Sequence, residues 1–175
     1  MMRVFMMMLC SLMAVCSVSA QGSRQEGTDR QAAIYRLPPF ERAVRCTKYF
    51  EGWHSEKHYP YVGWGHRLQK GERYSARTMT KPQADALLRK DLRKFIAIFR
   101  RFGADSILLG TLAFNVGPAK LLGGNGYPKS TLIRKLEAGD RNIYREYIAF
   151  CNYKGKRHAM LLKRRKAEFA LLYVP

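Results

Sequence analysis

The sequence is short of acidic residues. Its 175 residues include 32 lysines and arginines but only 13 aspartates and glutamates, a formal net charge of +19 at pH 7. A charge this large indicates a polyanionic partner. Inside a cell that partner would be nucleic acid. Outside the inner membrane it would be peptidoglycan, another acidic wall polymer or anionic lipid.

Long hydrophobic runs are also lacking, except at the N-terminus. There Arg3 precedes an apolar run from Val4 to Val15, followed by Val18-Ser19-Ala20. This pattern predicts a signal peptide over residues 1–20, because the run is short for a membrane anchor and ends in small residues. Its removal takes away only Arg3 among the charged residues and leaves +18. We therefore expect a periplasmic or secreted protein, with a wall polymer rather than nucleic acid as its partner.

Cysteine is scarce, and only Cys46 and Cys151 remain after the signal peptide. In an exported chain these two can form one disulfide. Two buried free thiols are the alternative, because sequence spacing does not determine the distance between Cα atoms.

Signals for cofactors are missing. Of the four histidines, only His54 and His58 are four residues apart, and they follow Gly52 in a predicted loop rather than on a helix. The glycines of residues 117–129 lack the spacing of a phosphate-binding loop. We expect no metal and no organic cofactor.

The chain divides into a polar leader, residues 21–36, which we expect to be disordered, and one domain over residues 37–175. The predicted fold class is α+β, mostly α, with a small antiparallel sheet of two or three strands within residues 59–74. Apolar spacing and capping residues predict helices over residues 40–51, 81–99, 106–116, 131–136, 141–151 and 159–172. Thr80 and Gln83 predict a capping box at the start of the second of these helices, and Asp105 and Asp140 are candidate caps for the third and the fifth.

Glu51 occupies a position where the helical pattern calls for an apolar residue. It follows Val44 by seven residues and Thr47 by four, in the last turn of its helix. Burial and the negative end of the helix dipole both disfavour the anion and should raise the pKa of Glu51. A carboxyl group that is neutral near pH 6–7 suits a general acid. The alternative is a structural glutamate that only bonds an arginine.

Asp91 also lies on a buried helix face, three residues after Leu88 and four before Phe95. A buried carboxylate needs a cation or several hydrogen-bond donors. We predict a structural ion pair, with His66 at the end of the small sheet as the candidate partner.

Three blocks resemble the phage-type lysozymes, glycoside hydrolase family 24, over about residues 40–173. Glu51-Gly52 resembles the family's catalytic Glu-Gly, and the sequence YVGWGH from Tyr61 to His66 resembles its Thr-Ile-Gly-x-Gly-His strand. The third block, from the helical lobe, comprises Leu112–Gly117, Ser130–Leu136, Ala138–Asp140 and Lys163–Glu168. The resemblance implies a sheet lobe joined by a long helix to a helical lobe, a cleft between them, and an ion pair at the positions of His66 and Asp91.

The resemblance also implies a function. Family members cleave the β-1,4 bond after N-acetylmuramic acid in peptidoglycan, and Glu51 matches their general acid. By the same resemblance Tyr61, Asn115 and Ser130 are candidate substrate-binding residues. We expect a monomer.

One part of the family pattern is absent. The family's second carboxylate is an aspartate between the glutamate and the strand, but no aspartate lies between Glu51 and Tyr61, and Tyr61 occupies the position of a threonine. Glu56 is either a relocated base or part of a solvated turn. His58 and Tyr61 either position a water or line the cleft. Trp53 and Trp64 either stack against sugar rings or pack in the core.

Three functions therefore stay open. The first is a muramidase with Glu51 as general acid. The second is a lytic transglycosylase, in which the 6-hydroxyl of the substrate attacks and Glu51 serves as acid and then as base. The third is a non-catalytic cationic protein that binds wall polymers or membranes. Such a binder would be indifferent to Glu51→Gln and sensitive to salt, whereas an enzyme would lose its activity.

Overall fold

The computed structural model describes residues 32–175, so the predicted signal peptide and most of the leader lie outside the described residues. The chain divides after Pro38 into two units. In the first, residues 32–35 are helical. The second is Pro39–Pro175, which begins two residues after the predicted start of the domain at residue 37. Within the described part of the chain, no helix is both long enough and apolar enough to span a membrane.

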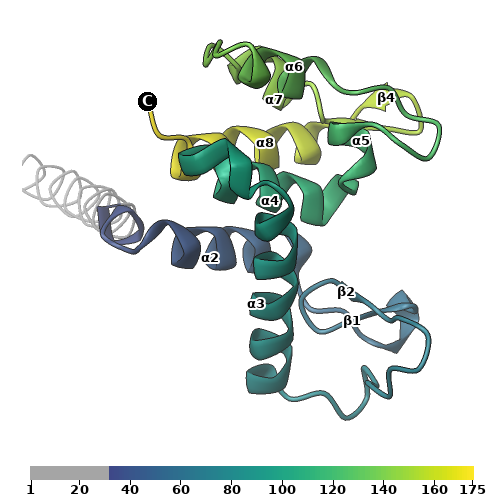
Figure 1. Ribbon diagram of the computed structural model, residues 1–175. Coiled ribbons are helices and arrows are strands. Elements are labelled where there is room, and N and C mark those ends of the chain that lie inside the picture. Colours follow the sequence, from purple (N-terminus) through teal and green to yellow (C-terminus); the bar gives the residue numbers. More distant parts are fainter. Residues whose placement is uncertain (1–31) are drawn as a thin grey trace, which may run out of the picture. The chain divides into compact units, whose positions relative to one another are not determined.

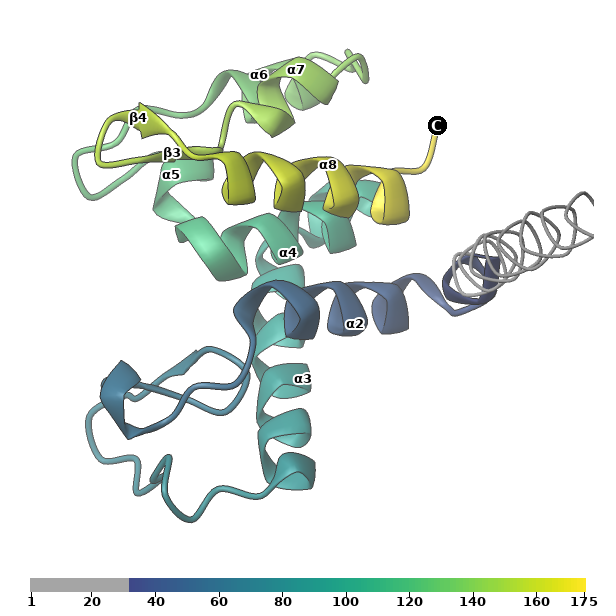
Figure 2. The same cartoon turned by 180° about the vertical axis from the view of Figure 1, so that it is seen from behind.

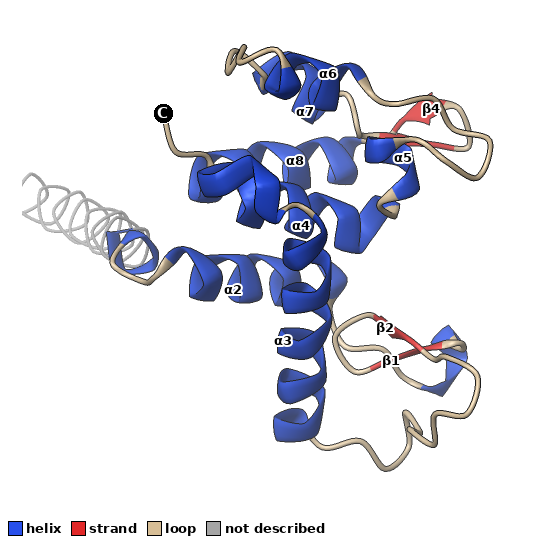
Figure 3. Ribbon diagram, viewed as in Figure 1, coloured by secondary structure: helices blue, strands red, loops and turns tan. Residues whose placement is uncertain are grey.

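The second unit is mostly helical with two small antiparallel sheets, which confirms the predicted α+β class (Figure 3). The first sheet pairs Tyr61 with Arg67 and Val62 with His66. In chain order the elements are α2 (Pro39–Glu51), the 3-10 helix η1 (Glu56–His58), β1 (Tyr61–Val62), β2 (His66–Arg67), α3 (Lys81–Ile98), the 3-10 helix η2 (Arg100–Asp105), α4 (Ser106–Val116), α5 (Ala119–Leu122), α6 (Thr131–Glu137), α7 (Tyr144–Ile148), β3 (Asn152–Tyr153), β4 (Lys156–Arg157) and α8 (Ala159–Leu172).

Two lobes are joined by the long helix α3, as predicted (Figure 1). The sheet β1–β2 lies beside α3, while α4 to α8 gather at the far end of that helix; the reverse view shows the same separation (Figure 2). Each lobe has its own core of buried apolar residues. Val62, Met79, Ala84 and Leu87 form the core of the sheet lobe, whereas the larger core of the helical lobe is centred on α4.

The start of α3 is a local sequence effect. The hydroxyl oxygen of Thr80 accepts a hydrogen bond from the backbone N–H of Gln83, and the Gln83 side chain accepts one from the backbone N–H of Thr80. This confirms the predicted capping box. The contact between α3 and α4 depends on Gly110, because a Cβ there would lie 2.7 Å from the backbone nitrogen of Ile96.

Several predicted elements differ from the structure. The predicted loop 117–129 contains α5. Asp105 does not cap α4, because its Oδ1 accepts a hydrogen bond from Arg141 instead. Asp140 accepts from the backbone N–H of Asn142 and so closes a turn, and α7 begins only at Tyr144. The hairpin β3–β4 was not predicted, because its strands have only two exposed residues each.

Cys46 and Cys151 are both buried and free, so the disulfide alternative is not formed. Cys46 lies on α2, and burial, with a contribution from the nearby Glu168 carboxylate, raises the pKa of its thiol to about 12. Both cysteines therefore serve as small apolar groups in the interior.

Candidate active site

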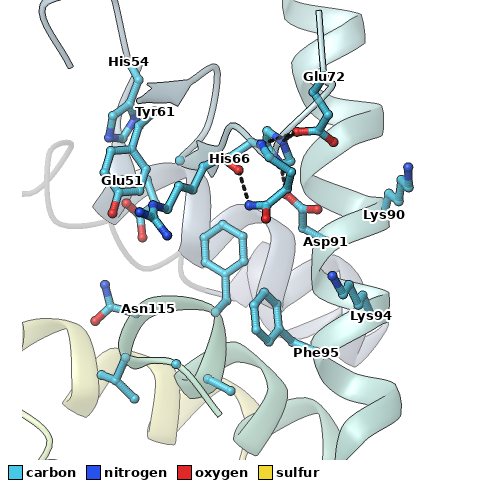
Figure 4. Close-up of a pocket in the computed structure, with 17 residues that line it drawn as sticks. Glu51, His54, Tyr61, His66, Glu72, Lys90, Asp91, Lys94, Phe95 and Asn115 are labelled. Atoms are coloured by element: carbon cyan, nitrogen blue, oxygen red, sulfur yellow. Dashed lines mark hydrogen bonds and ion pairs between the residues drawn. The ribbon is translucent and has the colours of Figure 1, made fainter. Parts of the chain in front are cut away.

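A cleft of about 1020 Å³ is lined by both lobes (Figure 4). Its residues come from three parts of the chain: the segment from the end of α2 to the loop after β2, one face of α3, and the C-terminal end of α4. They are Glu51, His54, Tyr61, Gly65, His66, Arg67, Gln69 and Glu72; Lys90, Asp91, Lys94 and Phe95; and Ala113, Phe114, Asn115, Val116 and Gly117.

Glu51 is the last residue of α2 and lines this cleft. Its side chain is only 16% exposed, as its place on the apolar stripe predicts. Its Oε1 accepts a hydrogen bond of 2.6 Å from Nη1 of Arg164, a residue of α8 whose side chain is 4% exposed. The Glu51 carboxylate therefore faces a buried cation from a distant part of the chain.

Arg164 belongs to a buried ionic network. Its Nε donates to Oε1 of Glu168 at 2.8 Å, and Nη2 of Arg165 donates to the same oxygen at 3.0 Å. The other oxygen of Glu168 accepts from the Tyr147 hydroxyl at 2.9 Å. Glu168 and Arg165 are fully buried. Burial lowers the pKa of Arg164, but the carboxylates of Glu168 and Glu51 outweigh this effect, so the pKa is raised and the guanidinium stays charged.

The network also reaches the opposite side of the cleft. Nη2 of Arg165 donates to Oδ1 of Asn115 at 3.2 Å, and Asn115 lines the cleft near the end of α4. Helix α8 therefore orients two cleft residues, Glu51 and Asn115, through adjacent arginines. The roles of Arg164, Arg165 and Glu168 were not predicted. The available signal was the spacing of three and four residues between each arginine and Glu168, which places all three on neighbouring turns.

His66 binds two carboxylates, one from each side of its ring. Nδ1 lies 2.6 Å from Oδ2 of Asp91, which confirms the predicted pair, and Nε2 lies 2.8 Å from Oε2 of Glu72. Burial lowers the pKa of His66, but the hydrogen bonds to Asp91 and Glu72 outweigh it and raise the pKa. The pKa of Glu72 is lowered by the backbone N–H of Gln69 and by His66. Glu72 was not predicted, because it lies in an irregular loop without periodicity.

The loop after α2 places its polar residues differently from the predictions. Glu56 pairs with Arg77 at 2.8 Å, with 58% of its side chain exposed, and does not line the cleft. This agrees with the solvated-turn alternative for Glu56, and the structure does not bring Glu56 to Glu51. Nδ1 of His58 accepts from the backbone N–H of Ser55, and His58 also lies outside the cleft lining. Tyr61 does line the cleft, beside His54, with ring centroids 5.8 Å apart.

The family model described as phage lysozyme matches residues 48–168, which is most of the chain and includes Glu51, His66, Asp91 and Arg164. The chain belongs to the phage lysozyme family.

Among solved structures, the fold is similar to the muramidase domain of SpmX from Asticaccaulis excentricus. The TM-score is 0.59 at 24% identity, and the match covers 76% of this chain and 95% of that domain. A likeness at this identity supports the fold. A search of curated proteins found no match.

Not all residues implied by the family resemblance lie in the cleft. Ser130 caps α6, where its hydroxyl oxygen accepts from the backbone N–H of Ile133, and it lines a separate hollow of about 480 Å³ with residues of α7. The structure thus does not bring Ser130 to Glu51. Trp53 and Trp64 pack edge to face, 5.1 Å apart, and neither lines the cleft. Trp64 packs against two apolar clusters, which agrees with the packing alternative.

The described residues contain no candidate metal site. Across residues 32–175, no three histidine, cysteine or acidic side chains are arranged to hold a metal ion. The acids of the cleft are instead bound to His66 and Arg164.

Proposed function

We propose that this family member cleaves the β-1,4 bond between N-acetylmuramic acid and N-acetylglucosamine in peptidoglycan, with Glu51 as general acid. One observation carries the proposal. The cleft is lined by three acids, and Asp91 and Glu72 are both bound to His66. Glu51 is the third of these acids; it is not paired with His66, and it stands at the position that matches the general acid of the family.

The contacts of Glu51 suit proton donation. Oε1 is held by Arg164, and within residues 32–175 no hydrogen bond engages Oε2. A sugar chain that fills the cleft would exclude water from Glu51 and bring its glycosidic oxygen within reach of Oε2. Glu51 then protonates the glycosidic oxygen as its bond to the anomeric carbon breaks. Arg164 stabilises the carboxylate that remains.

The net charge supports the same substrate. Without the predicted signal peptide the chain has a charge of +18 and is attracted to an anionic wall, which raises the local concentration of enzyme at its substrate. We propose that the protein is exported, as the N-terminal pattern predicts, and acts as a monomer on peptidoglycan, with other anionic wall polymers as secondary ligands and without nucleic acid.

A second mechanism has an observation of its own. Among the described residues, the other two carboxylates of the cleft, Asp91 and Glu72, are both paired with His66, so neither is an unpaired base for a water molecule. In a lytic transglycosylase none is needed, because the 6-hydroxyl of N-acetylmuramic acid attacks its own anomeric carbon. Glu51 would then act as acid and afterwards as base, and the product would be an anhydro sugar.

Mass spectrometry of the fragments released from purified peptidoglycan tests the proposal. The parent is compared with Glu51→Gln and with Glu56→Gln, a control that changes an exposed acid outside the cleft. We expect hydrated muropeptides from the parent and from Glu56→Gln, and none from Glu51→Gln. Anhydro-muropeptides would establish transglycosylation, whereas no fragments from any of the three would favour the non-catalytic wall binder.

A further inference from the structure

Hydrolysis needs a group that takes a proton from the attacking water, and in a glycosidase this is usually a second carboxylate. Here the acids near Glu51 are committed elsewhere: Glu56 to Arg77 outside the cleft, and Asp91 and Glu72 to His66. We propose that His54 accepts this proton, an inference that rests on the proposed function.

His54 lies at the same end of the cleft as Glu51 (Figure 4). It follows Glu51 by three residues, and its backbone N–H donates to the carbonyl oxygen of Gly63 at 2.8 Å. This bridge fixes the residue on the sheet lobe. Its ring lies 5.8 Å from the ring of Tyr61, so two polar aromatic side chains face the cleft beside the general acid.

The ring nitrogens of His54 are uncommitted. His66 binds a carboxylate with each of its nitrogens, and Nδ1 of His58 is bonded to Ser55. Across residues 32–175, by contrast, no hydrogen bond or ion pair involves the imidazole of His54, and its Nδ1 is buried without a partner. Because Nδ1 is buried, Nε2 is the nitrogen that can reach a molecule in the cleft.

An imidazole can accept a proton near neutral pH, and histidine is the commonest general base in enzymes. The oxygen of a water molecule attacks the anomeric carbon of N-acetylmuramic acid, and one of its protons passes to Nε2 of His54. The bond between that carbon and the glycosidic oxygen breaks, and the oxygen takes the proton of Glu51. Solvent then removes the proton from His54 and returns one to Glu51, so each turnover consumes one water.

Chemical rescue by azide tests this role, because azide is already an anion and needs no base to attack the anomeric carbon. The variants are His54→Ala, His54→Gln, Glu51→Gln and His58→Ala. His58 is a matched control, since its ring is 5.1 Å from that of His54 but lies outside the cleft lining. The readouts are the rate of muropeptide release, the identity of the products and binding to the wall.

We expect both His54 variants to release muropeptides on the order of 100-fold more slowly than the parent, with wall binding unchanged. Azide should restore the rate of His54→Ala and give a muramyl azide product. His58→Ala should stay within about twofold of the parent, and azide should not rescue Glu51→Gln, which lacks the acid rather than the base.

Three results would overturn the role of His54 while leaving Glu51 as the acid. They are parental rates in the His54 variants, a loss that azide does not rescue in a folded variant, and anhydro products from the parent. Parental activity in Glu51→Gln would instead overturn the proposed function itself. His54→Gln keeps a polar side chain of similar size, so it tests the base even if His54→Ala does not fold.

Discussion

Nη1 of Arg164 lies 2.6 Å from Oε1 of Glu51, although 113 residues separate the two in the sequence. The contact joins the end of α2 to α8, and the same arginine binds the fully buried Glu168. A single guanidinium therefore orients the proposed general acid and also neutralises a carboxylate inside the helical lobe. Positioning of the acid and stability of the lobe depend on the same side chain.

Replacing Arg164 with methionine should destabilise the protein by about 3–5 kcal/mol, because Glu168 would lose one of its two cations while buried. The measurement is urea unfolding followed by circular dichroism. Arg77→Met is the matched control, since it breaks an ion pair whose side chains are 78% and 58% exposed. We expect that control to change the unfolding free energy by less than about 1 kcal/mol. Equal losses in the two variants would contradict the role of the buried network.

Gly65→Ala should remove activity. Gly65 has φ +90°, and a Cβ there would lie 3.1 Å from the side-chain atoms Cγ, Cδ and Oε2 of Glu51. Gly71 has nearly the same φ, +89°, but open space around its Cα. Both alanine variants should lose about 1–2 kcal/mol of stability from backbone strain. Only Gly65→Ala should also stop the release of muropeptides, and a similar rate loss in Gly71→Ala would show that strain alone is responsible.

The His66 cluster should make stability depend on pH. The folded pKa of His66 lies above its unfolded value of about 6.5, so its contribution is fully present below that value and is lost as pH rises through the folded pKa. The pKa of Glu72 is lowered, so its contribution is present above about pH 4.5 and is lost as pH falls through the folded value.

Urea unfolding of the parent and of His66→Gln at a series of pH values measures this effect. The difference in unfolding free energy between them should be largest between about pH 4.5 and pH 6.5 and should shrink as pH rises further. A difference that stays constant up to about pH 9 would mean that the charge of His66 contributes nothing to stability.

Cys46 should resist thiol reagents in the native protein, because its side chain is buried and its pKa is about 12. Cys151 is also buried and should resist thiol reagents in the same way. Alkylation with iodoacetamide followed by peptide mapping should label neither residue in buffer and both in urea. A Cys46–Cys151 disulfide would instead leave both unlabelled in urea until a reductant is added.

Local sequence determined the helices and the candidate acid. The capping box at Thr80 started α3, the apolar spacing of residues 159–172 matched α8, and α2 ended at Glu51, directly before Gly52. These features depend on interactions between residues only a few positions apart, which periodicity and capping rules describe. The pairing of Asp91 with His66 also followed from the sequence, because a buried carboxylate needs a partner and the family pattern supplied one.

Only the tertiary structure decided what surrounds those residues. A helical pattern shows which face of α2 is buried, but it does not show that Arg164 of α8 lies opposite Glu51. The loop after α2 has no periodicity, so its sequence did not show which of Glu56, His58 and His54 lines the cleft. Folding of that loop put Glu56 with Arg77 and placed His54 in the cleft, because a loop conformation depends on the contacts made by the whole lobe.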